Sequence, residues 1–263
     1  MRRMPAEALL VGAVLLWSFN YTAVRFGVTH GFTPLAYAPL RWLLAGLALA
    51  TIVWTRGRSV RIGKRDLTVL ALVSLVGIVA NHVFGMLPVL ISLISQLAGV
   101  ERLRPRHWAA SGVSFAGVGL VALGAGGRLG GDLGGILLAL LTVCSFAVYS
   151  VAIVPVMRRH SPLAVAAVTT IIGSVLLSIV SAPFLARQDW GRPGPLAWSS
   201  LVYSALPSIV LGNILWFTAI NRVGPGRASL FTNLQPFVAA VFALLVLSEH
   251  LGALQVAGGF VIA

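Results

Sequence analysis

Uncharged, mostly apolar runs of about 20 residues recur along almost the whole of this 263-residue chain, and they constrain its fold more than any other feature. A helix needs roughly 20 such residues to cross a bilayer. Only 10% of the residues are charged, whereas soluble domains carry roughly 25%. We therefore expect an all-α polytopic membrane protein that meets the lipid bilayer along most of its surface. The expected crossings, about ten, are residues 7–27, 35–55, 67–84, 86–100, 107–125, 133–157, 162–186, 195–220, 226–248 and 250–263.

The net charge of +13 comes from basic residues gathered in short loops between the apolar runs. Cytoplasmic loops of membrane proteins collect lysine and arginine. If the N-terminus is cytoplasmic and two helices cross between residues 67 and 100, 14 basic residues lie inside and three outside. One crossing there would give 10 inside and seven outside, so the charge bias favours two. The sequence thus predicts a multi-pass protein of the inner (plasma) membrane with a cytoplasmic N-terminus. No nucleic-acid partner is expected, because the basic residues form no stripe on a soluble fold.

The chain contains an internal repeat. Residues 86–103 align without gaps with residues 234–251, and the alignment pairs Pro88 with Pro236. The two predicted repeats span residues 1–126 and 127–263. Because five helices is an odd number, the second repeat enters the membrane upside down relative to the first. Inverted repeats of this kind place a site at their interface that faces either side alternately, so the expected architecture favours transport.

The two halves differ in length near Gly85. Asn81 matches Asn213 at an offset of 132, but the prolines that follow match at 148, so the offset grows by 16. The second half uses the extra length for residues 217–232, which hold the end of one helix, a turn and the start of the next. We expect the first repeat to be about 16 residues short at this point and the last helix to be several residues short at Ala263. A deletion, a gene-model error and residues missing from the sequence fit this pattern equally.

Short motifs occur along the chain in an order typical of one family. They are Trp17-Ser18-Phe19-Asn20, Arg25, Pro34 and Arg41-Trp42, then Pro88 with Glu101-Arg102-Leu103, and in the second half Pro236 with Glu249-His250-Leu251. In these motifs the chain resembles the EamA-type transporters of the drug/metabolite transporter superfamily. The resemblance implies ten helices in two inverted five-helix repeats, and movement of small metabolites, often amino acids or related compounds, mostly outward. Besides the short segment near residue 85, the chain departs from the pattern in its second half, where Ala152 and Thr169 stand opposite Arg25 and Arg41.

Two arginines fall inside expected crossings. Arg41 lies about two turns from the outer end of its helix, whereas Arg25 lies near the outer end of the first helix. An ionisable side chain inside a membrane is costly and is therefore a functional candidate, and either arginine could hold a substrate carboxylate. The alternative is that both reach the outer interface or fix helix packing. Because Arg41 lies deeper, it is the stronger candidate for substrate contact.

Uncharged polar residues in the middle of the expected crossings complete the candidate site. A site for a zwitterion needs a few donors and acceptors on an apolar wall. The candidate substrate-binding residues are Trp17, Asn20, Tyr21, Arg41, Asn81, His82, Asn213, Trp216, Asn233 and Gln235. Each amide could instead join neighbouring helices, and His82 could relay a proton or simply pack between helices. The prolines inside crossings are candidate hinges or tolerated kinks; they are Pro88, Pro155, Pro207 and Pro236.

The sequence predicts a secondary transporter, acting as an exporter, with a small-molecule substrate such as an amino acid. All six acidic residues lie at helix ends or in loops, which disfavours proton-coupled export of cationic drugs through a mid-membrane carboxylate. The sequence has no HExxH or paired-carboxylate pattern to favour an integral-membrane enzyme and no phosphate-binding loop to favour ATP drive, so no metal or cofactor is expected. An inactive or partial transporter-like protein is the alternative, because a shortened first repeat should damage the core.

Overall fold

The computed structural model describes residues 4–56, 62–75, 151–247 and 252–262, together with residues 78, 113 and 120. Every regular element within these ranges is a helix. Five helices are long and apolar enough to cross a membrane, namely Ala6–Thr29, Pro34–Thr55, Pro162–Ala186, Pro195–Val223 and Pro225–Val246. The described part of the chain is thus all-helical, as predicted, and its five long apolar helices are consistent with a multi-pass membrane protein. The layout of ten helices in two repeats stays a prediction.

Several helix ends follow directly from the local sequence. Proline begins four helices, which are α2 (Pro34–Thr55), α9 (Pro162–Ala186), α10 (Pro195–Tyr203) and α12 (Pro225–Thr232). At a first helical position the missing N–H of proline costs nothing, and its fixed φ suits the turn. Gly224 separates α11 (Gly212–Val223) from α12 with a φ of 84°, a conformation that favours glycine. The turn expected between residues 217 and 232 is confirmed.

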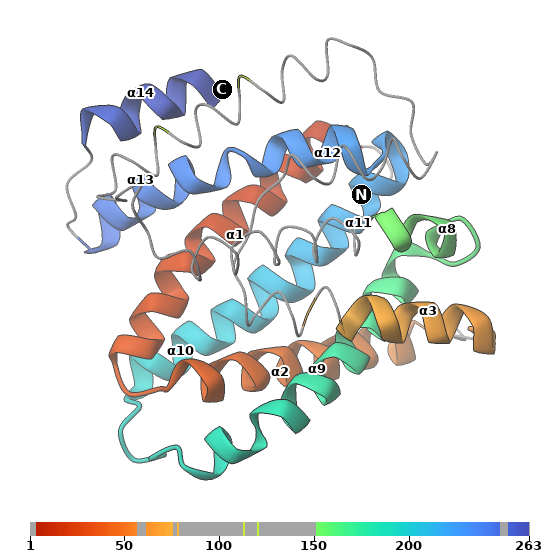
Figure 1. Ribbon diagram of the computed structural model, residues 1–263, viewed down its shortest axis with the longest axis horizontal. Coiled ribbons are helices and arrows are strands. Elements are labelled where there is room, and N and C mark those ends of the chain that lie inside the picture. Colours follow the sequence, from red (N-terminus) through yellow and green to blue (C-terminus); the bar gives the residue numbers. More distant parts are fainter. Residues whose placement is uncertain are drawn as a thin grey trace, which may run out of the picture.

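Helices from the two halves of the chain pack against one another. α1 (Ala6–Thr29) contacts α10, α11 and α13 (Gln235–Leu247), and α2 packs along α9. Figure 1 shows α1 lying between α11 and α13. Between α1 and α11 the core is apolar, and Leu9, Leu10, Trp216 and Phe217 belong to one cluster in which each of them is at most 1% exposed. Each of the first two helices is therefore covered by second-half partners.

Two of the expected crossings are interrupted. α10 continues into η2 (Ser204–Leu211), which is a π-helical segment, and then into α11. Similarly, α12 ends at Thr232 and α13 begins at Gln235. The last expected crossing corresponds to α14 (Ala253–Ile262). The interruptions fall at Pro207 and next to Pro236, two prolines that the sequence marked as hinges or kinks.

Other predicted features lie outside the described residues. They are the crossing 86–100, the crossing 107–125 apart from residues 113 and 120, residues 76, 77 and 79–84 of the crossing 67–84, most of 133–157, and the length difference near residue 85. Of the crossings 67–84 and 133–157, the structure contains α3 (Lys64–Ser74) and α8 (Val154–Met157). α3 packs against α9, so it too contacts a helix of the second half.

Gln188 joins the end of α9 to the loop between α1 and α2. Its Oε1 accepts hydrogen bonds from Thr33 N at 2.8 Å and from Thr33 Oγ1 at 2.9 Å, and its Nε2 donates to Gly31 O at 2.9 Å. The side chain is buried, so these bonds are shielded from water. They fasten a second-half loop to a first-half loop.

Asp66 makes the corresponding contact at the other end of α9. From the first turn of α3, its carboxylate accepts hydrogen bonds from Arg159 and, at 3.0 Å, from His160 Nε2. The His160 hydrogen bond, together with the charge of Arg159, holds the pKa of the Asp66 carboxyl below its ordinary value. Both ends of α9 are therefore attached to the first half of the chain.

Candidate functional site

A polar cluster lies where α1, α2 and η2 meet. Arg41 of α2 donates from Nη1 to Ser204 Oγ of η2 at 2.8 Å and to Asn20 Oδ1 of α1 at 3.5 Å. The Ser204 hydroxyl in turn donates to Asn20 Oδ1, and Ser204 is fully buried. A hydroxyl and an amide thus orient the guanidinium.

Tyr37 lies one helical turn before Arg41 and packs beside its guanidinium. Arg41 Cζ lies 6.0 Å from the centre of the Tyr37 ring, within reach of cation–π attraction. The Tyr37 side chain is buried, and its hydroxyl shares a 3.2 Å hydrogen bond with Ser200 Oγ of α10. Tyr37 therefore ties α2 to α10 directly next to the polar cluster.

Trp17 forms an aromatic wall on the α11 side of η2. Its Nε1 donates to the Ser208 carbonyl at 3.1 Å, and its ring centre lies 5.4 Å from that of Trp216. The indole lies against Gly212, where a Cβ would come within 2.5 Å of Trp17 Nε1. Only glycine at this position leaves room for the indole, so Gly212 determines how closely α1 approaches α11.

The start of α13 supplies a further side of the cluster. Gln235 is 5% exposed; its Oε1 accepts a hydrogen bond from Tyr21 OH at 3.4 Å, and its carbonyl accepts one from Ser18 Oγ at 3.3 Å. Asn233, in the break between α12 and α13, is 2% exposed. These contacts join α13 to the same helix that carries Asn20 and Trp17.

The structure brings together most of the residues that the sequence singled out. Those with described contacts in or beside the cluster are Trp17, Asn20, Tyr21, Arg41, Trp216 and Gln235. Asn233 is buried two residues before Gln235, and Asn213 follows Gly212 in α11 and is partly buried. Asn81 and His82 lie outside the described residues. That any of these residues binds substrate stays a prediction.

The second half offers no arginine opposite Arg41. Thr169 stands at that position of the repeat; it is buried and donates from Oγ1 to the Val165 carbonyl of its own helix at 2.8 Å. Arg25, the other arginine of an expected crossing, is exposed, in keeping with the interfacial alternative. The polar cluster is therefore asymmetric, with its cation supplied by the first half.

Sequence reasoning missed Tyr37, Ser204 and Ser208. Serine is common in membrane helices and usually returns its hydroxyl to a carbonyl of its own helix, so neither serine stood out. The available signal was Pro207, which lies between them and was marked as a hinge or kink. Nothing in the sequence indicated that this kink faces Arg41 and Trp17.

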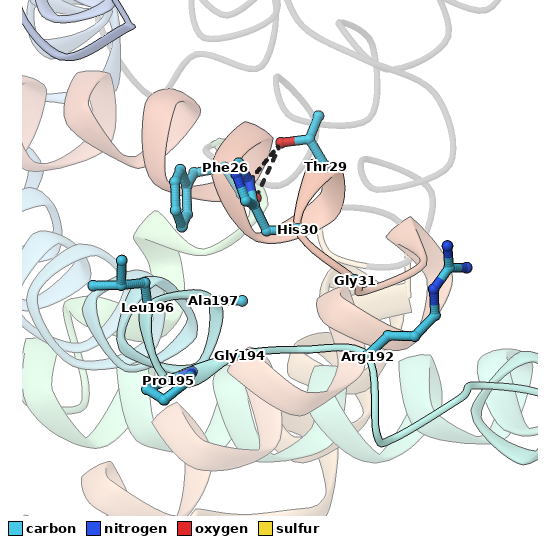
Figure 2. A pocket seen from close by; sticks show the side chains of 9 residues that line it. All are labelled: Phe26, Thr29, His30, Gly31, Arg192, Gly194, Pro195, Leu196 and Ala197. Atoms are coloured by element: carbon cyan, nitrogen blue, oxygen red, sulfur yellow. Dashed lines mark hydrogen bonds between the residues drawn. The ribbon is translucent and has the colours of Figure 1, made fainter.

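A pocket of about 490 Å³ opens at the end of α1 and the start of α10, as Figure 2 shows. Phe26 of α1 and His30, which follows the end of α1, line it, and their rings stack with centres 3.9 Å apart. Arg192 comes from the loop before α10, and Ala197 from α10 itself. By the charge bias of the loops, this end of the helices is expected to face outward.

An apolar layer lies between this pocket and the polar cluster. Ala197, which lines the pocket, belongs to a buried cluster with Phe32, Tyr37 and Leu201. Ala197 and Ser204 lie on the rod formed by α10, η2 and α11, and the seven residues of helix from one to the other rise about 10 Å. The pocket and the polar cluster are thus stacked along the rod, with the layer between them.

Comparison with known proteins decides the family. Residues 133–263 match the EamA-like transporter family. The chain belongs to this family. An EamA-like relative, the uncharacterized transporter YdeK of Bacillus subtilis (strain 168), is 28% identical over 259 residues, covering 91% of this chain and 88% of YdeK. The uncharacterized inner membrane transporter YedA of Escherichia coli (strain K12) is 25% identical, covering 90% of this chain and 81% of YedA.

Two further similarities extend over nearly the whole EamA-like chain. A probable terminal-alkyne amino-acid exporter of Streptantibioticus cattleyicolor is 27% identical, covering 98% of this chain and 91% of that protein. One solved crystal structure, 22% identical, superposes with a TM-score of 0.74 over 98% of this chain and 93% of its own, so the fold is shared. The family resemblance expected from the sequence is confirmed, and this EamA-like membrane protein is a transporter and not an enzyme.

Proposed function

We propose that this EamA-like protein is a secondary transporter that exports small carboxylate-bearing metabolites, amino acids among them, by alternating access between two inverted repeats. In this proposal Arg41 binds the substrate carboxylate. The observation that carries the proposal is the position of the Arg41 guanidinium, which Asn20 of the first half and Ser204 of the second half hold where the halves meet. A guanidinium matches a carboxylate with two parallel hydrogen bonds.

The cost of placing Arg41 in a membrane helix supports a functional role. An arginine at the middle of a membrane helix costs roughly 3 kcal/mol on insertion scales. The bonds to Ser204 and Asn20 offset part of this cost. A substrate carboxylate would add an opposite charge in surroundings of low dielectric constant, where the attraction is strong. An arginine at this position therefore costs free energy, and a role in substrate binding would explain why the chain has it.

The groups around Arg41 suit the rest of an amino acid. The Tyr21 hydroxyl and the Gln235 amide, from α1 and α13, could bind the substrate ammonium group. Trp17 and Trp216 offer an apolar wall for a side chain, as ligand sites usually do. The similarity to a protein named as a probable amino-acid exporter supports the same substrate class.

The expected sidedness supports an exit route for the substrate. The bias of the loop arginines favours an outer position for the pocket beside Phe26 and Arg192 and a cytoplasmic N-terminus. A substrate released from Arg41 toward this pocket would pass the layer that contains Tyr37. Tyr37 contacts Arg41 on one side and α10 on the other, so a change at Arg41 would reach the layer directly.

Substitution of Arg41 tests the proposal. Full-length protein in proteoliposomes is assayed for efflux of radiolabelled L-amino acids, one at a time, and of the amines that lack only the carboxylate. We expect the wild-type protein to move at least one amino acid in preference to its amine. We expect Arg41→Ala to lower that rate tenfold or more, because a hydrogen bond to a charged group contributes about 1.5–3 kcal/mol.

Arg25→Ala is the matched control, because Arg25 is an exposed arginine on the neighbouring helix α1. It should keep the wild-type rate, whereas Arg41→Lys, which keeps the charge and loses the planar fork, should give an intermediate rate. Equal rates for Arg41→Ala and wild type, or equal movement of amino acid and amine, would contradict the proposal.

A further inference from the structure

The rod formed by α10, η2 and α11 departs from α-helical geometry directly beside the candidate site. At the end of η2, Gly212 N–H donates to the carbonyls of Ile209 and Pro207, and the second of these lies five residues back. Figure 1 shows the rod passing beside α1. π-helical turns are rare and occur frequently at functional sites.

Pro207 explains part of this departure. Proline has no N–H to donate, and its ring would clash with the carbonyl four residues back in an α-helix; here that carbonyl belongs to Tyr203. Yet an internal proline alone does not make a helix π-helical. Pro39 lies inside α2 and Pro183 inside α9, and both helices remain α-helical.

What distinguishes Pro207 is the indole packed against the same segment. Trp17 Nε1 donates to the Ser208 carbonyl at 3.1 Å, across 191 residues of chain. This approach is open because Gly212 has no Cβ in the space that the indole occupies. A carbonyl of η2 is therefore hydrogen-bonded by a side chain of α1, which compensates for the irregular bonding within the helix.

η2 contacts the candidate site at its first residue and again near its middle. At the first end the Ser204 hydroxyl accepts from Arg41 and donates to Asn20, and further along the Ser208 carbonyl accepts from Trp17. An α-helix turns by a fixed amount per residue, so conversion of η2 to α-helix would rotate one contact relative to the other. Both contacts could not then persist with α1 and α2 where they are.

We propose that η2 is the positioning element of the substrate site and that Pro207 is its positioning residue. By holding the segment in π-helical form, Pro207 directs Ser204 toward Arg41 while Ser208 meets Trp17. This inference rests on the proposed function for the role of Arg41. It assigns to η2 the task of fixing where the guanidinium lies, and therefore where a carboxylate binds.

Pro207→Ala tests the proposal, with Pro183→Ala as the matched control because Pro183 is also internal to a helix. The full-length protein is labelled with ¹⁵N-tryptophan, and the Trp17 indole N–H resonance is identified among the seven tryptophans by its loss in Trp17→Phe. We expect Pro207→Ala to move this resonance and to raise the KM of the transported amino acid about tenfold, with kcat retained, the effect of one hydrogen bond to a charged group. Pro183→Ala should change neither.

Two further variants separate the effect of the Ser204 hydroxyl from the effect of the helix geometry. Ser204→Ala should raise the KM to a similar extent and leave the Trp17 resonance in place, because it removes the hydroxyl without changing the helix. Gly212→Ala should move the resonance with Pro207 intact, because the new Cβ would occupy the indole position, and it serves where Pro207→Ala does not fold. A folded Pro207→Ala protein with the wild-type resonance and the wild-type KM would overturn the proposal.

The resonance needs no substrate, so failure of the two proposals can be told apart. A wild-type protein that moves no amino acid would contradict the proposed function. The Trp17 resonance would still report whether Pro207 holds η2 in its π-helical form. An unmoved resonance in both Pro207→Ala and Gly212→Ala would contradict the role of η2, whatever the transport assay gives.

Discussion

Gly31 illustrates how a single backbone conformation determines the loop beside the pocket at the end of α1. Its φ is 120°, a value that residues with a Cβ rarely adopt. A Cβ at Gly31 would also lie 2.7 Å from both Arg192 C and Pro193 N. These are main-chain atoms, so they cannot move aside as the end of a flexible side chain could. Glycine is therefore required here by conformation and by space together.

We predict that Gly31→Ala lowers the free energy of unfolding by about 2 kcal/mol, because both the positive φ and the contact with main-chain atoms are unfavourable. Thermal unfolding of the full-length protein in detergent measures this as a lower Tm. Gly194→Ala is the control from the facing loop before α10, since its Cβ would meet nothing within 4 Å. A Gly31→Ala protein as stable as Gly194→Ala would show the prediction to be wrong.

At the scale of elements, both ends of α9 are attached to the first half of the chain. One end is joined to the α1–α2 loop through Gln188, and the other meets α3 through Asp66. The first contact is made of neutral groups, whereas the second contains a carboxylate with Arg159 and His160 around it, and Lys64 and Arg65 on its own helix turn. The two ends should therefore respond differently to pH.

We predict that Asp66→Asn lowers the Tm at pH 7 and that the difference from wild type fades in acid. The pKa of Asp66 is held below its ordinary value of 3.8. A carboxyl with a lowered pKa stabilises the folded state above its unfolded-state value, and this contribution is lost as the pH falls through the folded-state pKa. The difference in Tm should thus persist down to about pH 4 and shrink below it.

Asp189→Asn provides the comparison for Asp66, because Asp189 is an exposed aspartate in the α9–α10 loop. We expect it to change the Tm little at any pH. An Asp66→Asn difference of the same size at pH 7 and at pH 2.5 would mean that the carboxylate charge is not what stabilises this contact.

At the scale of the whole molecule, the described core is built between the halves of the chain. α1 packs with α11 and α13, and α2 with α9. The polar cluster follows the same rule, since Arg41 reaches Ser204 across 163 residues. A movement of one half relative to the other would therefore change the cluster first.

We predict that Arg192 faces outward and Arg158 faces the cytoplasm, as the loop charges indicate. Each is exposed, so each can be replaced by cysteine in a protein whose single native cysteine, Cys144, has been changed to alanine. A membrane-impermeant maleimide should label Arg192→Cys in intact cells and Arg158→Cys after the membrane is opened. The reverse pattern would invert the orientation and make the proposed export an import.

Much of the described fold follows from the sequence because the bilayer constrains it locally. An apolar run of about 20 residues forms a helix that satisfies its own backbone hydrogen bonds, so the long helices were predictable one at a time. Prolines and Gly224 marked the ends of helices for equally local reasons. The family could be inferred too, because its motifs are short and occur in a fixed order.

The arrangement of the site was decided by the tertiary structure. The sequence named Arg41 and Trp17, but their partners Ser204 and Ser208 lie 163 and 191 residues away and resemble any other helix serines. The π-helical form of η2 depends on an indole from α1 as well as on Pro207, and Pro39 and Pro183 leave their helices regular. Local composition determines that a segment is helical, because helix hydrogen bonds are local. Which side chains meet in the site depends on the packing of distant segments, and no local pattern encodes it.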